Sequence, residues 1–383
     1  MNPLRPAILA AAGSTRMKRA ITGFPVTAEV VHRFVAGETR ADLAPVVRDL
    51  LDSGRLVSVD FLGEYTTERS MADDAVAEYL ALIDELARWN RSARAGGDVR
   101  TGPSAGISVG SRSNGSAGDA LPTSPADAAP AHAEVPPTRH AGGPSADDAP
   151  AERHNGGSSR QFVAPVEVSV KLSALGQALG PEGPEIAASN LRILCARAQQ
   201  AGVWITVDAE DHTTTGGTEA TVRRLRADYT WLAVATQTYL RDAERRCGDA
   251  ASTGARIRLC KGAYREPERV AYQRTAEVDE SYLRCLELLM GGPGYPMVAT
   301  HDPVMIAAAE HMAGENGRVP GDFEFQMLYG IRSIEQLRLV EAGHAVRVYV
   351  PYGNQWYGYL MRRLAERPAN LGFFLRALTE RHR

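Results

Sequence analysis

Eight short apolar segments recur along the chain, and stretches with helical periodicity separate them. The segments are Leu56–Phe61, Val166–Lys171, Val203–Asp208, Trp231–Thr236, Arg256–Cys260, Pro296–Thr300, Asp322–Gln326 and Ala345–Val350. Each has the length of a strand, and we take them as buried strands without strict alternation, which is typical of a parallel sheet. Eight such units in about 300 residues favour an α/β fold of the TIM type, a distorted (β/α)8 barrel.

Helix signals precede and separate these strands. Thr39 with Asp42 forms a capping-box pattern before an apolar face that ends at Gly54, and similar patterns open helices at Ser70 and Ser333. Further helical periodicity follows Thr27, covers Ile186–Ala198 and surrounds Val278–Leu289. We therefore expect a helical segment over residues 1–55, a first barrel unit over 56–90 and the rest of the barrel over 161–383.

An open doubly wound sheet is the alternative arrangement for alternating strands and helices. Such folds commonly bind nucleotides at a G-x-G-x-x-G turn or a G-x-x-x-x-G-K-[ST] loop, and neither pattern follows any of the predicted strands. The absence of both patterns argues against the open sheet and favours the closed barrel.

Residues 91–160 have a different composition from the rest of the chain. They contain 14 Ala, 11 Gly, 10 Ser and 8 Pro, but no Phe, Trp or Tyr. Such a segment cannot bury enough apolar surface to offset its ordering entropy. We expect a disordered insertion on the amino-terminal side of the barrel, away from a functional site.

The overall composition excludes several classes of protein. The net charge of −3 argues against a dedicated nucleic-acid binder. No stretch reaches the roughly 18 apolar residues that span a bilayer. The four cysteines form no C-x-x-C pair and no zinc-type spacing, so we expect reduced thiols, a cytoplasmic location and no metal site.

Ionisable and polar side chains gather where the predicted strands end. They include Lys171, Asp208, Glu210, Asp211, Gln237, Tyr239, Arg258, Lys261, Thr300, His301, Asp302, Glu324, Gln326, Arg347 and Tyr349. Any one of them has a structural explanation, such as a helix cap or an ion pair inside the barrel. Together they indicate a functional site, because the carboxyl ends of barrel strands form one rim. If the following segment is helical, it places Tyr359, Arg362, Arg363 and Glu366 on one face.

Several of these segments together resemble the proline dehydrogenase family. The resemblance is carried by KLSALG, the D-x-E of DAED, RLCKGAY, ATHDP, FEFQMLYG and RVYVPYGNQWYGYLMRRLAERPANL. The leading GFPVTAEVVHRFVAGET is similar to the amino-terminal helices of bacterial monofunctional members. The resemblance covers nearly the whole chain outside residues 91–160.

This resemblance implies a flavoprotein that uses FAD to oxidise L-proline to 1-pyrroline-5-carboxylate. Hydride would pass to flavin N5, and electrons would continue to a membrane quinone. A separate 1-pyrroline-5-carboxylate dehydrogenase is a further expected partner, and nucleic acid is not. The expected location is the cytoplasm, with peripheral contact at the inner face of the cell membrane.

The resemblance also implies residue roles. Asp208 and Arg258 would be the catalytic acid and base pair. The substrate-binding residues would be Lys171, Tyr264, Leu328, Tyr349, Tyr359, Arg362, Arg363 and Glu366, with the two adjacent arginines on the proline carboxylate. The cofactor-binding residues would be Ala209, Gln237, Arg258, Lys261, Gly262, Ala263, Thr300 and His301.

Two alternatives to this reading stay open on the sequence alone. One is another flavin-dependent barrel enzyme, similar to methylenetetrahydrofolate reductase, and the other is a degenerate barrel that only binds a ligand. The adjacent arginines after YVPYG favour a small carboxylate substrate over the first. The presence of Lys171 and Arg258 argues against the second. Cys260 departs from the family pattern, in which we expect a valine or a similar small apolar residue.

Overall fold

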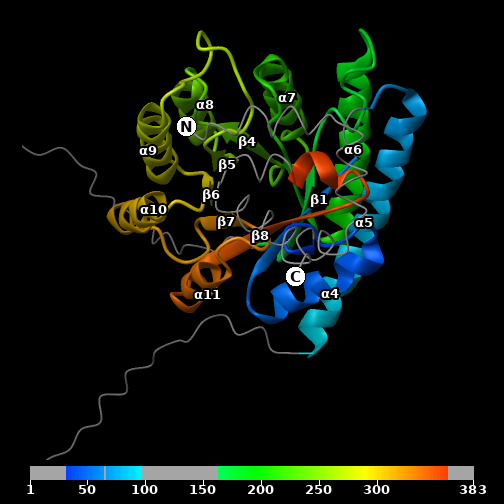
Figure 1. Ribbon diagram of the computed structural model, residues 1–383, viewed down its shortest axis with the longest axis horizontal. Helices are drawn as coiled ribbons and strands as arrows, with labels where there is room; N and C mark the ends of the chain where they lie inside the picture. The colour runs from blue at the N-terminus through cyan, green and yellow to red at the C-terminus, as the bar shows by residue number, and fades with distance from the viewer. Residues whose placement is uncertain (1–31, 64–65, 97–162, 361–383) are drawn as a thin grey trace, which may run out of the picture. The chain divides into compact units, whose positions relative to one another are not determined.

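Eight parallel strands close into a barrel in the order in which they occur in the chain (Figure 1). The computed structural model describes residues 32–63, 66–96 and 163–360. The strands are β1 (Leu56–Phe61), β2 (Val166–Val170), β3 (Trp204–Val207), β4 (Ala233–Gln237), β5 (Arg256–Cys260), β6 (Tyr295–Ala299), β7 (Glu324–Leu328) and β8 (Ala345–Tyr352). Closure runs through β1 and β8, where Leu56 to Phe61 pair with Arg347 to Tyr352. The predicted TIM-type barrel is confirmed, and the open sheet is excluded.

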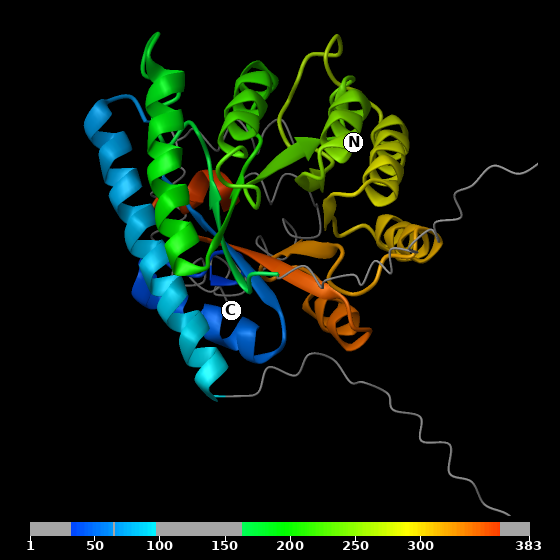
Figure 2. The ribbon, with the colours of Figure 1, turned by 180° about the vertical axis from the view of Figure 1, so that it is seen from behind.

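One helix follows each of the strands β1 to β7 in the described part of the chain and lies on the outside of the barrel (Figures 1 and 2). These helices are α5 (Arg69–Gly96), α6 (Gly183–Ala201), α7 (His212–Leu225), α8 (Ala243–Ser252), α9 (Thr275–Gly291), α10 (Pro303–Glu315) and α11 (Ser333–Glu341). Because neighbouring strands are all parallel, the carboxyl ends of the eight strands lie at one rim, as the fold requires.

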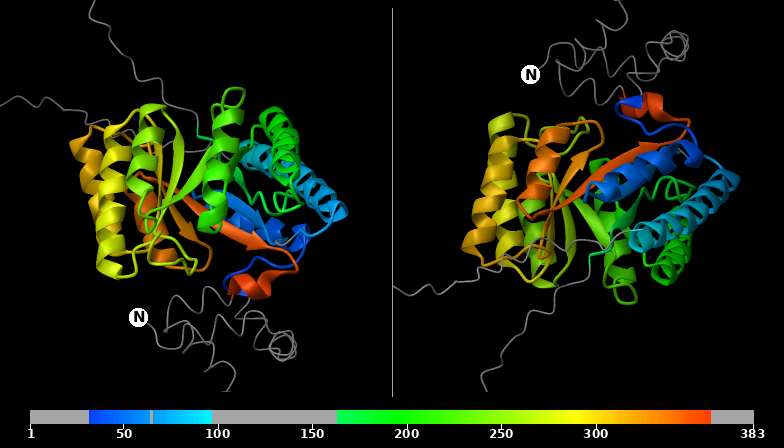
Figure 3. Two further views of the ribbon diagram at one scale, coloured as in Figure 1. Left: turned by 90° about the horizontal axis from the view of Figure 1, so that it is seen from above. Right: turned by 90° about the horizontal axis from the view of Figure 1, so that it is seen from below.

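Helix α4 (Arg40–Asp52) precedes the barrel and packs against β1, β8 and α5. It thereby covers the strands at which the sheet closes, between α5 and α11 (Figure 3, right). The chain after β8 is helical from residue 356, next to the segment that leads into α4. Two backbone hydrogen bonds join these segments, from Ala36 to Pro351 and from Gly353 to Gly37. A helix from before the barrel thus covers its closing seam.

Strands β1, β2, β5, β7 and β8 alternate between apolar residues that face the helices and polar or charged residues that face the lumen. In β2, Val166, Val168 and Val170 belong to the main apolar core, while Glu167 and Ser169 bond with side chains of other strands across the barrel. The prediction of non-alternating strands was therefore wrong. It failed because the lumen holds several ion pairs, so one side of strands such as β2 is polar although the strand is fully buried.

The predicted elements agree with the structure to within a few residues. The capping box of Thr39 and Asp42 is present at α4, with mutual hydrogen bonds between side chains and backbone. Ser333 does not cap α11, because Arg332 occupies the N-cap position and makes no capping bond with its side chain. Arg332 adopts a left-handed backbone, with φ of 51°. Helices α7, α8 and α10 were not predicted from the sequence.

Some predicted features lie partly or wholly outside the described residues. The helical stretch after Thr27 is outside up to residue 31, and the described Phe34 and Val35 are buried in a non-helical segment. Helix α5 continues to Gly96, six residues into the segment predicted as an insertion, and the remainder from residue 97 is outside. Residues 361–383 are outside as well. Within the described parts, no helix is long and apolar enough to cross a bilayer.

Candidate active site

Asp208 and Arg258 form a buried ion pair at the carboxyl end of the barrel. Asp208 directly follows β3, and Arg258 is the central residue of β5, from which its side chain reaches Asp208. Oδ1 of Asp208 accepts from Nη1 of Arg258 and from the hydroxyl of Ser169, the latter at 2.9 Å. Asp208 is 9% exposed and Arg258 is 5% exposed. The structure brings together the two residues predicted to act as a pair.

All five N–H donors of the Arg258 guanidinium bond within the protein. Their acceptors are Gln326 Oε1 at 2.6 Å, Ser169 Oγ at 2.6 Å, Asp208 Oδ1, Ser58 Oγ at 3.1 Å and Glu167 Oε1 at 2.7 Å. Burial alone would lower the pKa of Arg258, but the carboxylates of Asp208 and Glu167 outweigh it and raise that pKa. Arg258 is therefore a fixed cation. Its geometry does not support the role of a base that the resemblance implied.

Lys171 follows β2 and lies beside this pair. Its ammonium nitrogen is 2.7 Å and 2.8 Å from the two carboxylate oxygens of Asp60, the fifth residue of β1. It is 3.8 Å from Oδ2 of Asp208. Both partners are buried, with Lys171 7% and Asp60 1% exposed. Two ion pairs thus lie side by side: Lys171 with Asp60 joins the neighbouring strands β2 and β1, and Asp208 with Arg258 joins β3 to β5 across β4.

Tyr349 from β8 completes this group. Its hydroxyl donates to Oδ2 of Asp208 at 2.9 Å, and its ring lies 5.4 Å from the guanidinium carbon of Arg258. Burial raises the pKa of Tyr349 well above its usual range, and the negative charges of Asp208 and Asp60 add to this effect. The phenol therefore stays protonated and remains a donor.

A second layer of charged residues lies beneath this group. Glu167 accepts from Arg256 at 3.1 Å as well as from Arg258, and Glu324 makes a bidentate pair with Arg347 at 2.7 Å and 2.9 Å. Arg256 also lies over the ring of Trp204, 3.7 Å from its centroid. Each of these charges has an opposite partner, which makes burial tolerable.

Among the described residues, the buried charges of the lumen balance. The four anionic residues are Asp60, Glu167, Asp208 and Glu324, and the four cationic residues are Lys171, Arg256, Arg258 and Arg347. None of the eight is more than 9% exposed. The interior is therefore close to neutral before any ligand binds.

The side chains predicted to contact a cofactor lie on the same rim, beyond β4, β5 and β6. Gln237 ends β4 and is 3% exposed, yet its Oε1 has no hydrogen-bond partner among the described residues. The hydroxyl oxygens of Thr206 and Thr238 are also buried without a hydrogen-bond partner among the described residues. A buried polar atom without a partner is costly, so a bound ligand with polar edges fits this side of the barrel. The residues present are thus compatible with a flavin.

Lys261 and Gly262 follow β5. The Lys261 ammonium lies 2.6 Å from Asp279 and 2.8 Å from Asp302. Burial would lower the pKa of Lys261, but these two carboxylates raise it. Gly262 has φ of +106°, and a Cβ there would lie 2.3 Å from the ring of Tyr239. Glycine is therefore needed for packing within the protein, whatever the loop binds.

His301 links β6 to β7 at this rim. Its Nε2 accepts the backbone N–H of Leu328 at 2.8 Å, and its carbonyl accepts from Arg332 at 2.7 Å. A ring nitrogen that accepts carries no hydrogen, so the neutral ring is protonated at Nδ1. Thr300 accepts the backbone N–H of Asp302, which caps α10 through Val304. Asp302 therefore both caps α10 and pairs with Lys261.

Other acidic residues after β3 hold loops. Glu210 accepts from the hydroxyl and the backbone N–H of Ser173, at 2.5 Å and 3.1 Å, and thereby joins the loops after β2 and β3. Asp211 caps α7 through the backbone N–H of Thr213. Asp211 is thus a helix cap and Glu210 joins two loops, so both have a structural role of the kind that the sequence allowed for single residues.

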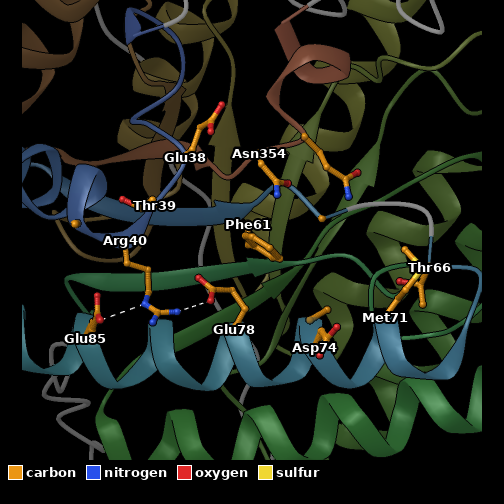
Figure 4. A pocket seen from close by; sticks show the side chains of 14 residues that line it. Glu38, Thr39, Arg40, Phe61, Thr66, Met71, Asp74, Glu78, Glu85 and Asn354 are labelled. Carbon is orange, nitrogen blue, oxygen red and sulfur yellow. Dashed lines mark hydrogen bonds and ion pairs between the residues drawn. The ribbon is translucent and has the colours of Figure 1, made fainter. Parts of the chain in front are cut away.

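A cavity of about 760 Å³ lies beside the barrel rim rather than over the charged group. Its lining comes from the start of α4, the end of β1, α5 and the turn after β8 (Figure 4). Arg40 reaches across it to Glu78 and to Glu85, the latter at 3.2 Å. Carboxylates outnumber cations in this lining, so it does not suit an anionic substrate.

Comparison with known proteins decides the family. The family model described as proline dehydrogenase matches residues 44–376. Proline dehydrogenase 2 of Bacillus subtilis (strain 168) is 37% identical over 214 residues, which are 56% of this chain and 70% of that protein. Proline dehydrogenase of Deinococcus radiodurans is 40% identical over 216 residues, which are 55% of this chain and 69% of that protein. The chain belongs to the proline dehydrogenase family.

A solved structure supports the fold of this family member. Proline utilization A from Bdellovibrio bacteriovorus, in a form inactivated by N-propargylglycine, aligns with a TM-score of 0.65 at 24% identity. The alignment covers 88% of this chain but 32% of that protein. The chain thus spans about a third of this larger relative, whose likeness shows the barrel.

The structure places most of the predicted site residues of this proline dehydrogenase on one rim. Ala209, Ala263 and Tyr264 lie in the loops after β3 and β5, and Leu328 ends β7 beside Tyr349 of β8. Tyr359 is 6% exposed in the helical segment after β8. Arg362, Arg363 and Glu366 lie outside the described residues, so their roles stay predictions.

Sequence reasoning missed several residues that the structure places in this group. Asp60, Ser58, Glu167 and Ser169 all bond directly with Lys171, Arg258 or Asp208. A signal was present, since Ser58 and Asp60 alternate with Val57 and Val59, which points a carboxylate away from the apolar face. This signal is weak, because β1 ends in the apolar Phe61 and its carboxylate lies one position earlier.

Proposed function

We propose that this chain oxidises L-proline to 1-pyrroline-5-carboxylate with FAD as cofactor and passes the electrons to a membrane quinone. In this reaction proline loses a hydride from the carbon next to its nitrogen and a proton from the nitrogen itself. The observation that carries the proposal is the buried group of Lys171, Asp208, Arg258 and Tyr349, at the rim of a proline dehydrogenase barrel. Family membership supports proline as the substrate.

The chemistry that FAD supplies when bound is acceptance of that hydride at N5. The residues that would hold it are Gln237, whose buried oxygen lacks a partner in the described structure, and the Lys261–Ala263 loop and His301 around it. Arg258 would lie at the reacting side as a cation that cannot lose its proton. A fixed positive charge there stabilises the negative charge that develops on hydride transfer.

The protein side of the reaction is mainly positioning. Asp208 holds Arg258, lies near Lys171 and accepts from Tyr349, so it fixes three side chains at once. Lys171 carries a positive charge toward the rim, where the proline carboxylate needs cations, and we assign the remaining grip to Arg362 and Arg363. The rings of Tyr349, Tyr359 and Tyr264, with Leu328, would surround the apolar part of proline and exclude water.

The electron acceptor and location belong to the same proposal. A quinone dissolved in a membrane requires at least transient docking, so we propose a peripheral contact at the inner face of the cell membrane. The product would pass to a 1-pyrroline-5-carboxylate dehydrogenase. Larger relatives from Salmonella typhimurium and Escherichia coli, each described as bifunctional protein PutA, support a link to a second activity.

An anaerobic visible spectrum of the purified protein tests the proposal, taken before and after addition of L-proline. Flavin bands that bleach with L-proline, but not with the same amount of D-proline, support cofactor, substrate and half-reaction together. Flavin bands that persist would retain the cofactor and overturn the substrate. A colourless protein that takes up no added FAD would overturn the enzyme function.

A further inference from the structure

Asp60 is the most deeply buried charged residue in contact with Lys171. It lies near the carboxyl end of β1, where Val57 and Val59 face the helices, so Asp60 points into the lumen with Ser58. Both of its carboxylate oxygens lie within 2.8 Å of the Lys171 ammonium, and it is 1% exposed. No role for this residue follows from the sequence motifs.

Asp208 is already engaged by other groups and is a weaker partner for Lys171. Its Oδ1 accepts from Arg258 and Ser169, and its Oδ2 accepts from Tyr349. The distance from Oδ2 to the Lys171 ammonium is 3.8 Å, which is beyond a hydrogen bond. Asp60, rather than Asp208, is thus the principal counter-ion of Lys171.

This division keeps two ion pairs separate. With Asp60 in place, Asp208 bonds with Arg258 and Tyr349, while Lys171 is held from the neighbouring strand β1. Without Asp60, the nearest carboxylate to this buried ammonium among the described residues would be that of Asp208, which Arg258 and Tyr349 share. The ammonium would then compete with Arg258 and Tyr349 for that carboxylate, or lose its proton, because burial disfavours an unpaired charge.

We propose that Asp60 is a positioning residue for proline oxidation, which fixes Lys171 in place as a cation for the substrate carboxylate and keeps it from displacing Arg258 and Tyr349 on Asp208. This inference rests on the proposed function. The competing explanation is an interior ion pair that only stabilises the barrel, like that of Glu324 and Arg347 one layer below.

The pH dependence of ligand binding separates the two explanations. Among the described residues, the charged or titratable groups by Lys171 are Asp60 of β1, Asp208 after β3 and Tyr349 of β8, with Arg258 of β5 bound to Asp208. Arg258 and Tyr349 keep their protons, because the pKa of each is raised. A loss of carboxylate binding on the basic side would therefore report Lys171, and removal of its counter-ion should move that loss to lower pH.

The test uses the full-length, FAD-loaded protein and a saturated five-membered ring carboxylate that lacks the ring nitrogen and cannot be oxidised. Its dissociation constant is measured from the change in the flavin spectrum across pH. We call the loss of binding at high pH the basic limb. For Asp60→Asn we expect binding about tenfold weaker at neutral pH, because Lys171 loses a charged hydrogen bond. We also expect the basic limb to lie about one pH unit lower or more, because Lys171 loses its counter-ion. Asp60→Glu should retain the position of the limb.

Two matched variants make the result specific. Glu324→Gln removes an equally buried carboxylate from the lower layer, and should lower stability without moving the basic limb. In a Lys171→Met background, Asp60→Asn should weaken binding no further, because it acts through Lys171. The double variant also removes both charges, so it should fold even if Asp60→Asn alone does not.

The outcomes distinguish the inference from the function on which it rests. If L-proline does not bleach the wild-type flavin, the proposed function fails. If wild type is bleached, but Asp60→Asn leaves the basic limb in place or weakens binding equally without Lys171, the positioning role is overturned. A shifted limb that depends on Lys171 supports it.

Discussion

The hydroxyl of Tyr349 reaches across the barrel to donate to Oδ2 of Asp208, at 2.9 Å, although β8 and β3 are separated by two other strands. The same carboxylate accepts from Arg258 through its other oxygen. Asp208 therefore connects Tyr349 of β8 to Arg258 of β5 through its two carboxylate oxygens. Any change in the tyrosine should be felt at the arginine, even though the ring itself only borders the site.

Replacement of Tyr349 by phenylalanine should reduce proline oxidation while the barrel stays folded. The variant leaves a buried carboxylate oxygen without its donor, which costs about 1.5–3 kcal/mol and corresponds to a loss of about 10- to 100-fold in kcat/KM. Steady-state kinetics with L-proline measure this loss. Tyr229→Phe, on the amino-terminal side of β4, should leave kcat/KM unchanged; an equal loss there would contradict the assignment.

The same contact determines how Tyr349 responds to pH. Because burial and the charges of Asp208 and Asp60 raise its pKa, no loss of activity below about pH 10, the usual range for a tyrosine, should come from Tyr349. A titration of tyrosinate absorbance should therefore show the same change below that pH in wild type and in Tyr349→Phe. A smaller change in the variant would show that Tyr349 ionises early.

Much of the fold was predictable because local patterns determine it. The strand Leu56–Phe61 and the strand Arg256–Cys260 coincide with the observed β1 and β5, since apolar runs bounded by helix signals mark such strands well. The helices α7, α8 and α10 were not predicted. Their sequences are rich in Thr, Ala or charged residues, and tertiary packing rather than strong periodicity holds them in place.

The site was predictable only in part. Lys171, Asp208 and Arg258 were found because each is a charged residue at or near the end of an apolar strand. Which charge pairs with which depends on closure of the barrel, and that is not encoded in any local motif. Asp60 is 111 residues from its partner Lys171, and Glu167 lies 91 residues from Arg258. A pairing at such separations becomes visible only when the strands are in register.

Glu167 should make stability depend on pH at the acid end. Burial would raise the pKa of Glu167, but Arg347, Arg258 and Arg256 outweigh it and lower that pKa to about 2. In the unfolded chain the value is about 4.3. The carboxylate thus stabilises the fold fully above about pH 5, and this contribution, on the order of 3 kcal/mol, is lost as the pH falls towards 2.

Urea unfolding at about pH 7 and about pH 3 measures this contribution. Glu167→Gln should be less stable than wild type at neutral pH, because it leaves buried guanidiniums without a counter-ion, but its stability should fall less on acidification. Glu185→Gln is the comparison, since Glu185 forms an exposed pair with Arg224. If Glu167→Gln and wild type lose equal stability in acid, the account of Glu167 is wrong.

Arg318 should stabilise the amino-terminal face of the barrel without influencing catalysis. Its guanidinium donates to the carbonyl oxygens of Leu289, Met290, Gly292, Gly294 and Asp322, at 2.7–3.1 Å. It thereby satisfies the end of α9 and the start of β6 together. Arg318→Ala should lower the free energy of unfolding by at least about 2 kcal/mol, because several charged hydrogen bonds are lost.

The KM for L-proline should not change in Arg318→Ala, since the residue lies at the end of the barrel opposite to the charged rim. Arg192→Ala serves as the reference, because Arg192 pairs with Asp228 at 3.6 Å with both side chains more than half exposed. Its loss should cost less than about 0.5 kcal/mol. A raised KM in Arg318→Ala with normal stability would contradict the structural role.

Removal of residues 101–159 should leave proline oxidation intact. The strands on either side pair without them, since Val57 aligns with Val166 and donates to the carbonyl of Pro165 at 2.9 Å. Helix α5 packs against α6 and β2 before this segment begins. The join also lies between a helix and the strand that follows it, at the end of the barrel away from the rim that carries Lys171 and Arg258. A shorter connection costs less closure entropy, so the free energy of unfolding should rise by on the order of 1 kcal/mol.

Replacement of the segment by a Gly/Ser chain of equal length separates length from sequence: it should match wild type in both kcat/KM and stability. A folded deletion variant that binds FAD but no longer oxidises proline would show that the segment contributes to the site.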